Sequence, residues 1–236
     1  MKTALILTLL SFLFTFSGPV LALTAPATSS AIIDPGKLEV GEALISPASS
    51  LYFLKALRER IELFMSADSQ VRAQRELEFA VRRLREVNTL IEKNRQDLIE
   101  ETLQRYKDAI WQARDLAADN STDESFQEGI GESVARHLYV LQTLYNQTNN
   151  LNAKRAVRAS VQEIMDYENG LIKGIKDPAL KQELITRVGL RMQAGCQFLE
   201  EQVNSSDLNQ TQQAILQEYV TNCQKDSLKF GTIPNK

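Results

Sequence analysis

The chain has 236 residues, of which 43% are hydrophobic and 24% are charged, with 27 basic and 30 acidic side chains. This hydrophobic content is enough to form a core and excludes a chain that is disordered throughout. The formal net charge of −3 argues against a nucleic-acid-binding protein and against an anionic-membrane footprint.

The first residues have the pattern of an export signal. A lysine precedes a predominantly apolar run at residues 4–16, and small residues follow at Val20 and Ala22. We therefore predict a signal peptide over residues 1–22, cleaved after Ala22, and an exported protein, extracellular or periplasmic. An uncleaved anchor formed by Ala4 to Leu23 is the alternative. No second hydrophobic stretch follows, so we expect no membrane span after signal removal.

Residues 23–45 are rich in Ala, Thr, Ser, Pro and Gly and have no sustained period. This composition predicts a flexible lead before a helical domain at residues 46–230.

The segment from Ser49 to Met65 has the strongest amphipathic pattern in the chain. Its apolar residues step by three and four positions and so fall on one face of a helix. They are Leu54, Leu57, Ile61 and Phe64, with Phe53 and Met65 widening the stripe. We expect this stripe to be buried against later helices, because a lone helix of this length is marginal in water. On that phase, Leu54→Ala or Ile61→Ala should cost about 2–5 kcal/mol of stability, and Arg60→Ala less than about 0.5 kcal/mol.

A motif extends from just before this helix into the next two. It consists of Pro47, Ser49, Leu51, Tyr52, Phe53, Leu54, Lys55, Glu59, Arg82, Arg83, Leu84, Glu86 and Tyr106. This set, over about residues 45–118, resembles the bacterial domain-of-unknown-function family DUF5667, which has a Pro-x-Ser-Pro-Leu-Tyr-Phe-Leu-Lys opening followed by Glu-rich and Arg-Arg-Leu helices. The resemblance implies a helical fold and an exported protein. It implies no activity and therefore no catalytic residue.

Six further helices are expected from apolar residues at helical spacing and from capping or turn residues between them. Asp68 is expected to cap the second, and Pro178 suits the first turn of the sixth. Asp207 and Gln210 have the spacing of a capping box at the start of the seventh. The expected ranges are 68–93, 96–118, 123–147, 152–173, 178–203 and 207–225.

No strand-like alternation of useful length occurs, and the connections between the expected helices are short. The sequence therefore predicts an all-α protein of about seven helices, arranged as an antiparallel multi-helix bundle or as stacked helical hairpins. A subdivision near residue 149 is an open alternative.

The two cysteines, Cys196 and Cys223, favour a disulfide between the last two predicted helices, because they form an even pair in a chain expected to enter an oxidising compartment. Two buried free thiols are the alternative. A straight hairpin would leave these residues about 10 Å out of register. The bond therefore requires the seventh helix to begin later than residue 209 or to cross the sixth at an angle.

Few residues have the pattern of a chemical site. His137 is the only histidine, which excludes histidine clusters, and it lies beside an apolar stripe. The acidic cluster Asp119, Asp123, Glu124 and Glu128 lacks the glycine and the final glutamate of an EF-hand, so a helix-capping acidic turn is favoured over a calcium site. We predict no catalytic, cofactor-binding or metal-binding residue.

Two other clusters allow two interpretations each. The basic run Arg82, Arg83 and Arg85 shares its helix with several glutamates, so we expect a solvated, ion-paired face. Four aromatic residues suit either a core or a ligand groove between helices, with the core favoured. They are Tyr52, Phe53, Tyr106 and Trp111.

These observations favour a non-enzymatic envelope protein, either a scaffold or a module that binds a protein partner. The alternative is a ligand- or metal-sensing module with an interhelical pocket. We expect no nucleic-acid partner.

Overall fold

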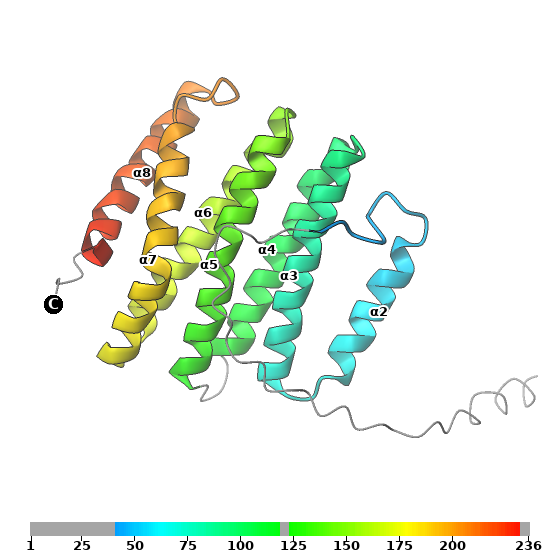
Figure 1. Cartoon of the computed structure of the whole chain (residues 1–236), viewed down its shortest axis with the longest axis horizontal. Coiled ribbons are helices and arrows are strands. Elements are labelled where there is room, and N and C mark those ends of the chain that lie inside the picture. Colours follow the sequence, from blue (N-terminus) through cyan, green and yellow to red (C-terminus); the bar gives the residue numbers. More distant parts are fainter. Residues whose placement is uncertain (1–40, 119–122, 232–236) are drawn as a thin grey trace, which may run out of the picture. The chain divides into compact units, whose positions relative to one another are not determined.

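The computed structural model describes residues 41–118 and 123–231, with side chains up to residue 226 (Figure 1). Within these residues there are seven α-helices, one 3-10 helix and no strands, which confirms the all-α prediction. The predicted signal peptide and most of the predicted lead lie outside the described residues. No helix in the described part is long and apolar enough to cross a membrane.

The helices agree with the predicted ranges to within a few residues. They are α2 Tyr52–Met65, α3 Ser69–Glu92, η1 Gln96–Leu98, α4 Ile99–Ala118, α5 Glu124–Gln147, α6 Leu151–Gly174, α7 Pro178–Glu201 and α8 Gln210–Gly231.

Short polar residues start these helices. Asp68 accepts hydrogen bonds from the backbone amides of Gln70 and Val71, as predicted, and Asp177 caps α7 in the same way. Such caps satisfy amides that have no partner within the helix.

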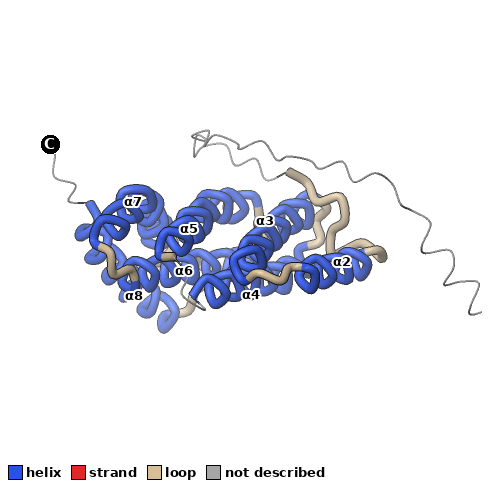
Figure 2. Tube along the Cα trace, turned by 90° about the horizontal axis from the view of Figure 1, so that it is seen from below, coloured by secondary structure: helices blue, strands red, loops and turns tan. Residues whose placement is uncertain are grey.

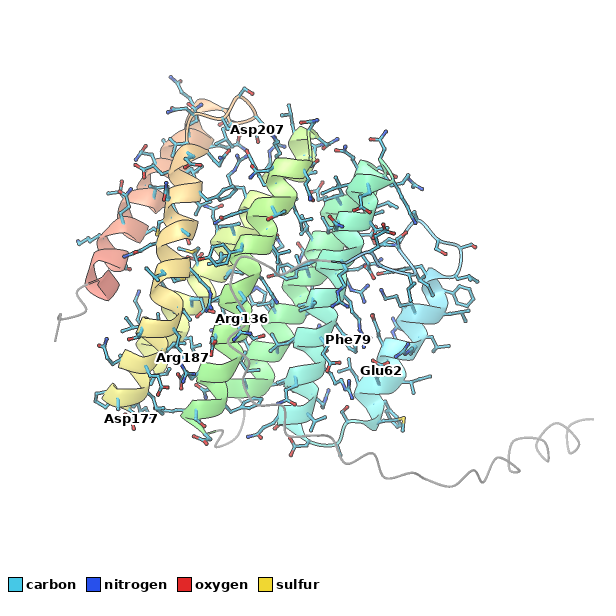
Figure 3. The ribbon with its side chains drawn as sticks, viewed as in Figure 1. Glu62, Phe79, Arg136, Asp177, Arg187 and Asp207 are labelled. Carbon is cyan, nitrogen blue, oxygen red and sulfur yellow. A yellow bond between two sulfur atoms is a disulfide. The ribbon has the colours of Figure 1, made fainter. Side chains whose placement is uncertain are left out.

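The capping prediction for α8 is wrong by two residues. Asn209 Oδ1 accepts from the Gln212 amide at 2.9 Å, and Gln212 Oε1 accepts from the Asn209 amide at 3.0 Å. The Asp207 carboxylate binds the buried Arg158 guanidinium instead, because a buried cation needs an anionic partner. Figure 3 shows Asp207 in the connection between α7 and α8.

The helices form antiparallel hairpins, α3 with α4, α5 with α6 and α7 with α8, that stack side by side. In Figure 2, α3, α5 and α7 lie in one layer and α4, α6 and α8 in the other. The lone helix α2 packs on α3 at one edge of the stack. The described structure therefore has two edge helices, α2 and α8.

One continuous core lies between the two layers. Its fully buried side chains come from helices on both sides of residue 149 and include Leu84, Leu103, Leu138, Ile164 and Leu184. At Gly195, an added Cβ would lie 2.5 Å from Met165 Sδ, so the side chain of α6 packs directly on the α7 backbone.

Cys196 and Cys223 form a disulfide with their Cα atoms 5.9 Å apart, in agreement with the predicted pairing. Cys223 lies 13 positions after Gln210, whereas Cys196 lies five positions before Glu201, a mismatch of about 12 Å along the axes. The connection at residues 202–209 contains successive hydrogen-bonded turns and lies at the top of the hairpin in Figure 1. Because α8 begins at Gln210, it starts later than residue 209, which is one of the two conditions predicted for the bond.

Candidate functional site

The helix α2 packs on α3 with its polar side. Glu59 is the only buried residue of α2, and Tyr52, Lys55 and Glu62 on the same side are partly buried. The predicted apolar stripe faces solvent: Leu54 is 47% exposed, Ile61 51% and Phe64 91%. The predicted phase of this helix is therefore wrong by about half a turn.

The physical reason for this orientation lies on α3. Glu86 is completely buried and Arg83 is 6% exposed, and neither charge could be covered by leucine or phenylalanine side chains without a large desolvation penalty. The polar side of α2 supplies the opposite charges. Of the predicted solvated face of α3, Arg82 and Arg83 are ion-paired as expected but lie under α2, whereas Arg85 is exposed.

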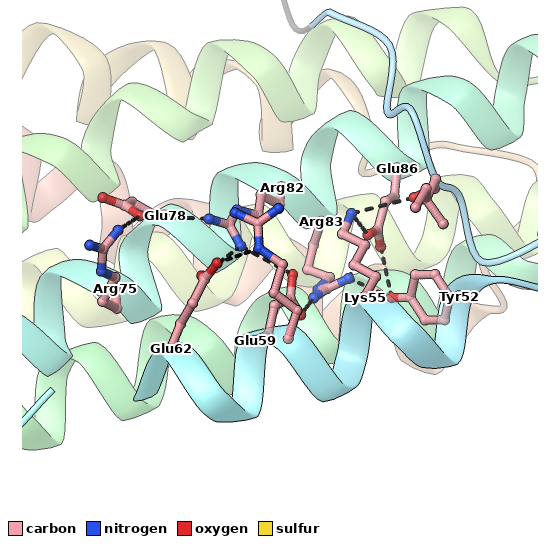
Figure 4. Close-up of polar contacts among 11 residues, drawn as sticks. Tyr52, Lys55, Glu59, Glu62, Arg75, Glu78, Arg82, Arg83 and Glu86 are labelled. Carbon is pink, nitrogen blue, oxygen red and sulfur yellow. Dashed lines mark hydrogen bonds and ion pairs between the residues drawn. The ribbon is translucent and has the colours of Figure 1, made fainter. Parts of the chain in front are cut away.

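Three signature residues of α2 contact two of α3 in one connected group (Figure 4). Arg83 donates to Glu59 Oε2, to the Tyr52 hydroxyl and, at 2.5 Å, to Glu86 Oε1. The Tyr52 hydroxyl donates to Glu86 Oε2 at 3.1 Å. Lys55 donates to Glu86 Oε1 as well. Together these contacts join the first turns of α2 to the middle of α3.

A second group continues along the same two helices. Arg82 donates to Glu62 Oε2 at 3.1 Å and lies 3.6 Å from Glu59 Oε1, while Arg58 donates to Glu62 Oε1 at 2.6 Å. Arg82 also lies 3.8 Å from Glu78, as Figure 4 shows. These side chains are more exposed than those of the first group, so each pair contributes less to stability.

Two ionisable side chains at the contact between α2 and α3 have raised pKa values. Burial, followed by the charge of Glu86, raises the pKa of Tyr52 to about 12. Burial, followed by the nearby charge of Glu59, raises the pKa of Glu76 to about 7. Glu76 therefore titrates near neutral pH at the contact between α2 and α3.

The solvent side of α2 is a continuous apolar strip. At 100° per residue its members span about 120° of the helix circumference. We call this strip the outward face; it consists of Phe53, Leu54, Leu57, Ile61, Phe64 and Met65. Arg60 borders it on one side and Arg58 on the other, and both are exposed.

The exposed apolar surface is concentrated at this edge of the molecule. Among the described residues, 13 large hydrophobic side chains are exposed, and eight of them lie between Leu44 and Met65. Leu44 and Leu51 extend the outward face onto the segment before α2. A contiguous apolar patch of this kind is typical of an interaction site, whereas scattered apolar residues are not.

A basic groove of about 420 Å³ lies beside the outward face. Four basic residues and one acidic residue, Glu42, line it together with apolar side chains. The basic residues are Lys55, Arg58, Arg82 and Arg85.

A second groove, of about 510 Å³, lies between α2, α3 and α4. Its polar lining includes Glu59, Glu76, Arg83, Arg105 and Asp108. Glu59 Oε1 is buried and accepts no hydrogen bond within the described part of the chain. This groove has the size of a small-molecule site.

The four aromatic residues considered for a ligand groove do not line one groove together. Tyr106 is in the core, Tyr52 is in the ion-pair network, and Phe53 and Trp111 are 65% and 40% exposed. Only Tyr52 lines the groove between α2, α3 and α4.

His137 is a core residue. It is 2% exposed, its Nδ1 lies 3.1 Å from the Tyr106 hydroxyl, and burial lowers its pKa to about 4. The ring is therefore neutral at physiological pH. On α6, Glu168 is fully buried with no hydrogen bond to either oxygen among the described residues, and burial raises its pKa well above the ordinary value. The signal that could have identified Glu168 is its position within the apolar stripe of α6, four residues after Ile164 and four before Ile172.

The acidic cluster acts at helix ends. Asp123 caps α5, Glu124 accepts from the backbone amides of Lys176 and Asp177, and Glu128 lies 3.3 Å from Arg187. Figure 3 shows Asp177 at the start of α7 and Arg187 farther along that helix. Asp119 lies outside the described residues. In the described residues no group of three or more potential ligands could bind a metal ion.

The family comparison is consistent with this geometry. The sequence model of DUF5667, a domain of unknown function, matches residues 44–168, more than half of the chain. The chain belongs to the DUF5667 family. The matched region begins at the segment before α2 and ends in α6, so it includes the outward face and the whole ion-pair network. No curated protein and no solved structure matches the chain.

The family signature thus has three structural roles. Tyr52, Lys55, Glu59, Arg82, Arg83 and Glu86 dock α2; Leu84 and Tyr106 are core residues; Leu51, Phe53 and Leu54 are exposed. Pro47 and Ser49 are partly buried in the segment that leads into α2, where the Ser49 carbonyl accepts from the Tyr52 amide.

Proposed function

We propose that this DUF5667 protein is an exported, non-enzymatic docking module that binds its partner in the cell envelope through the outward face of α2. The observation that supports this most directly is the orientation of α2, which turns its charged side toward the protein and its apolar side toward solvent. An exposed apolar helix face is costly in water and becomes favourable when a partner covers it.

Export is supported by the sequence of the first 22 residues and by the disulfide, since disulfides persist in oxidising compartments. The family has no assigned reaction, and the buried His137 and Glu168 are each inaccessible to a substrate in solution. These features favour binding over catalysis.

The test compares retention on the envelope fraction. In a bacterial host, the wild-type chain should sediment with envelopes, and the triple variant Leu57→Ser, Ile61→Ser and Phe64→Ser should be released. Leu190→Ser is the matched control, because Leu190 is 74% exposed on α7, away from the outward face. Equal retention of the wild-type protein and the triple variant would contradict the docking function. N-terminal sequencing of the retained protein, expected to begin at Leu23, tests export.

The second candidate is a ligand-sensing module that uses the groove between α2, α3 and α4. Glu59 Oε1, which is buried and accepts no hydrogen bond among the described residues, and the neighbouring Glu76 favour an organic ammonium ligand there. Spermidine should then raise the melting temperature as RT ln(1 + [L]/Kd), and Glu59→Gln should abolish the rise. A melting temperature independent of spermidine would exclude this class of ligand.

A further inference from the structure

We propose that the outward face of α2 lies on a lipid bilayer, with the basic groove beside it binding anionic phospholipid headgroups. This inference rests on the proposed docking function and names the partner of the same surface. The bilayer is the interfacial environment into which an amphipathic helix inserts one side without crossing.

The shape and composition of the outward face suit a bilayer. The residues protrude from a helix at the edge of the stack, so the surface is convex, and Phe64 is almost completely exposed at 91%. Insertion into a bilayer needs no complementary groove in the partner. Phenylalanine, leucine and isoleucine on one face, with arginine at its borders, are typical of helices that lie in the membrane interface.

The orientation of α2 is fixed by its contacts with α3. Arg83 and Glu86 of α3 bind the polar side of the helix through Tyr52, Lys55 and Glu59. The helix therefore cannot rotate its apolar residues inward without breaking buried ion pairs. A flat bilayer surface can cover the whole length of α2 in this orientation.

Charge is distributed unevenly around the outward face. The chain has a net charge of −3, which argues against an anionic-membrane footprint only if that charge is spread evenly. On α2, both glutamates face α3, and the exposed charges that border the outward face are Arg58 and Arg60. The basic groove adds the exposed Arg85 near Leu54. Lys55, Arg58 and Arg82 are paired with glutamates, so Arg60 and Arg85 are the exposed cations around α2 that phosphate groups complement.

The same charges disfavour a second copy of the chain as the partner. A two-fold dimer would place the outward face of one copy against that of the other. Arg60 and the Glu62-paired Arg58 would then approach the same arginines of the other copy, and the outward face itself contains no carboxylate. Like charges at such an interface weaken association.

The sequence before α2 agrees with a membrane-proximal position. The apolar run at residues 4–16 is expected to take the chain to a membrane during export, and residues 23–51 connect that region to α2. If the run is retained as an anchor, these residues span at most roughly 100 Å when extended. The outward face would then stay within reach of the same bilayer.

Vesicle sedimentation tests the proposal. The chain without its predicted signal, residues 23–236, contains all the described helices and avoids insertion by the N-terminal run. It should sediment with phosphatidylcholine vesicles that contain 30% phosphatidylglycerol, and more weakly with pure phosphatidylcholine. Sedimentation with neither vesicle type would overturn the proposal.

Variants separate the two components of the surface. Phe64→Ser should weaken binding to both vesicle types about tenfold, since it removes one large inserted side chain. Arg85→Glu should weaken binding to the anionic vesicles and have little effect on pure phosphatidylcholine. Leu190→Ser should change neither. Binding that Phe64→Ser leaves unaltered, or that Leu190→Ser weakens equally, contradicts a role of the outward face.

Two results would identify a different partner. A concentration-dependent dimer of residues 23–236 that Phe64→Ser dissociates, without vesicle binding, assigns the face to a second copy. Envelope retention that depends on the outward face, again without vesicle binding, assigns it to a protein. Either result overturns the bilayer proposal while the docking function stands, whereas loss of face-dependent retention overturns the docking function itself.

Discussion

The two edge helices of the stack are attached by opposite physical means. At one edge, α8 buries Leu216 and Val220 and is covalently bound to α7 through Cys196 and Cys223. At the other edge, α2 buries Glu59 and contacts α3 through ion pairs. Both helices have amphipathic sequences, and they present opposite sides to the protein.

The side by which an edge helix is attached determines which of its residues remain exposed to solvent. A helix that is attached by its apolar side exposes polar residues such as Gln217 and Glu218 of α8, with Ile215 as an apolar exception. A helix that is attached by its charged side exposes its apolar residues. The buried network under α2 is therefore as much a part of the candidate site as the outward face, because it determines which side is displayed.

Removal of the central cation under α2 should have the largest effect. Arg83→Ala leaves Glu59 and Glu86 without their shared partner, and breaking a buried ion pair in this way costs about 3–5 kcal/mol. We expect α2 to separate from α3. Hydrogen exchange should show faster exchange at residues 52–65, while α5 to α7 keep their protection.

Arg75→Ala is the control for this variant. Arg75 pairs with Glu78 at 2.7 Å on the exposed surface of α3, where such a pair contributes less than about 1 kcal/mol. If Arg75→Ala and Arg83→Ala had equal effects on exchange at α2, the network would not be what docks the helix.

Loss of the disulfide between α7 and α8 should have the second-largest effect on stability. The bond joins residues 27 positions apart, and closing a loop of that size stabilises the fold by about 2–4 kcal/mol. Cys196→Ser with Cys223→Ser should lower the melting temperature, and a reductant should lower it equally in the wild type but have no further effect on the double variant. Two reactive thiols in the unreduced, denatured wild type would contradict the bond.

The helices could be predicted from the sequence because the signals that define them are local. Asp68 and Pro178 mark helix starts within a few residues of the apolar period, and the same short-range chemistry operates in the folded chain. The predicted start of α8 was two residues too early because Asp207 and Asn209 are both residue types that cap helices well. Only the presence of the buried Arg158, 49 positions away, selects between them.

The orientation of α2 could not be predicted in this way. The apolar residues Leu54, Leu57 and Ile61 and the charged residues Lys55, Glu59 and Glu62 both recur at helical spacing, so either side qualifies as the buried one. The deciding signal is on α3, where Arg82, Arg83 and Glu86 have complementary charges at matching intervals. The family signature contains most of these residues, but a signature does not state which of them touch.

The free energy of unfolding should also depend on pH through Glu76 at the contact between α2 and α3, by less than the effects of these substitutions. The pKa of Glu76 is raised by burial and by Glu59 from 4.5 to about 7, so the folded state binds the proton more tightly. The stabilisation that this group contributes is fully present below about pH 4.5 and is lost as the pH rises through 7.

Glu76→Gln should remove this dependence. His137 acts in the opposite direction, because its folded pKa of about 4 makes the protein less stable as the pH falls below 6.5. The difference between wild type and Glu76→Gln, measured by denaturant unfolding from pH 4 to 8, isolates the glutamate. A difference that does not change with pH would show that Glu76 is not perturbed at the α2 contact.

The smallest expected effect is that of Ile61→Ala, and it tests most directly whether the apolar side of α2 faces solvent. With Ile61 51% exposed on the outward face, Ile61→Ala should change the free energy of unfolding by less than about 0.5 kcal/mol, although the sequence pattern predicted 2–5 kcal/mol. Leu84→Ala, on the buried side of α3, should cost about 2–5 kcal/mol in the same assay. Equal destabilisation by the two variants would mean that Ile61 packs inward in solution. A near-neutral Ile61→Ala, together with a large cost for Arg83→Ala, requires an α2 helix attached through its charges, since no apolar attachment produces both results.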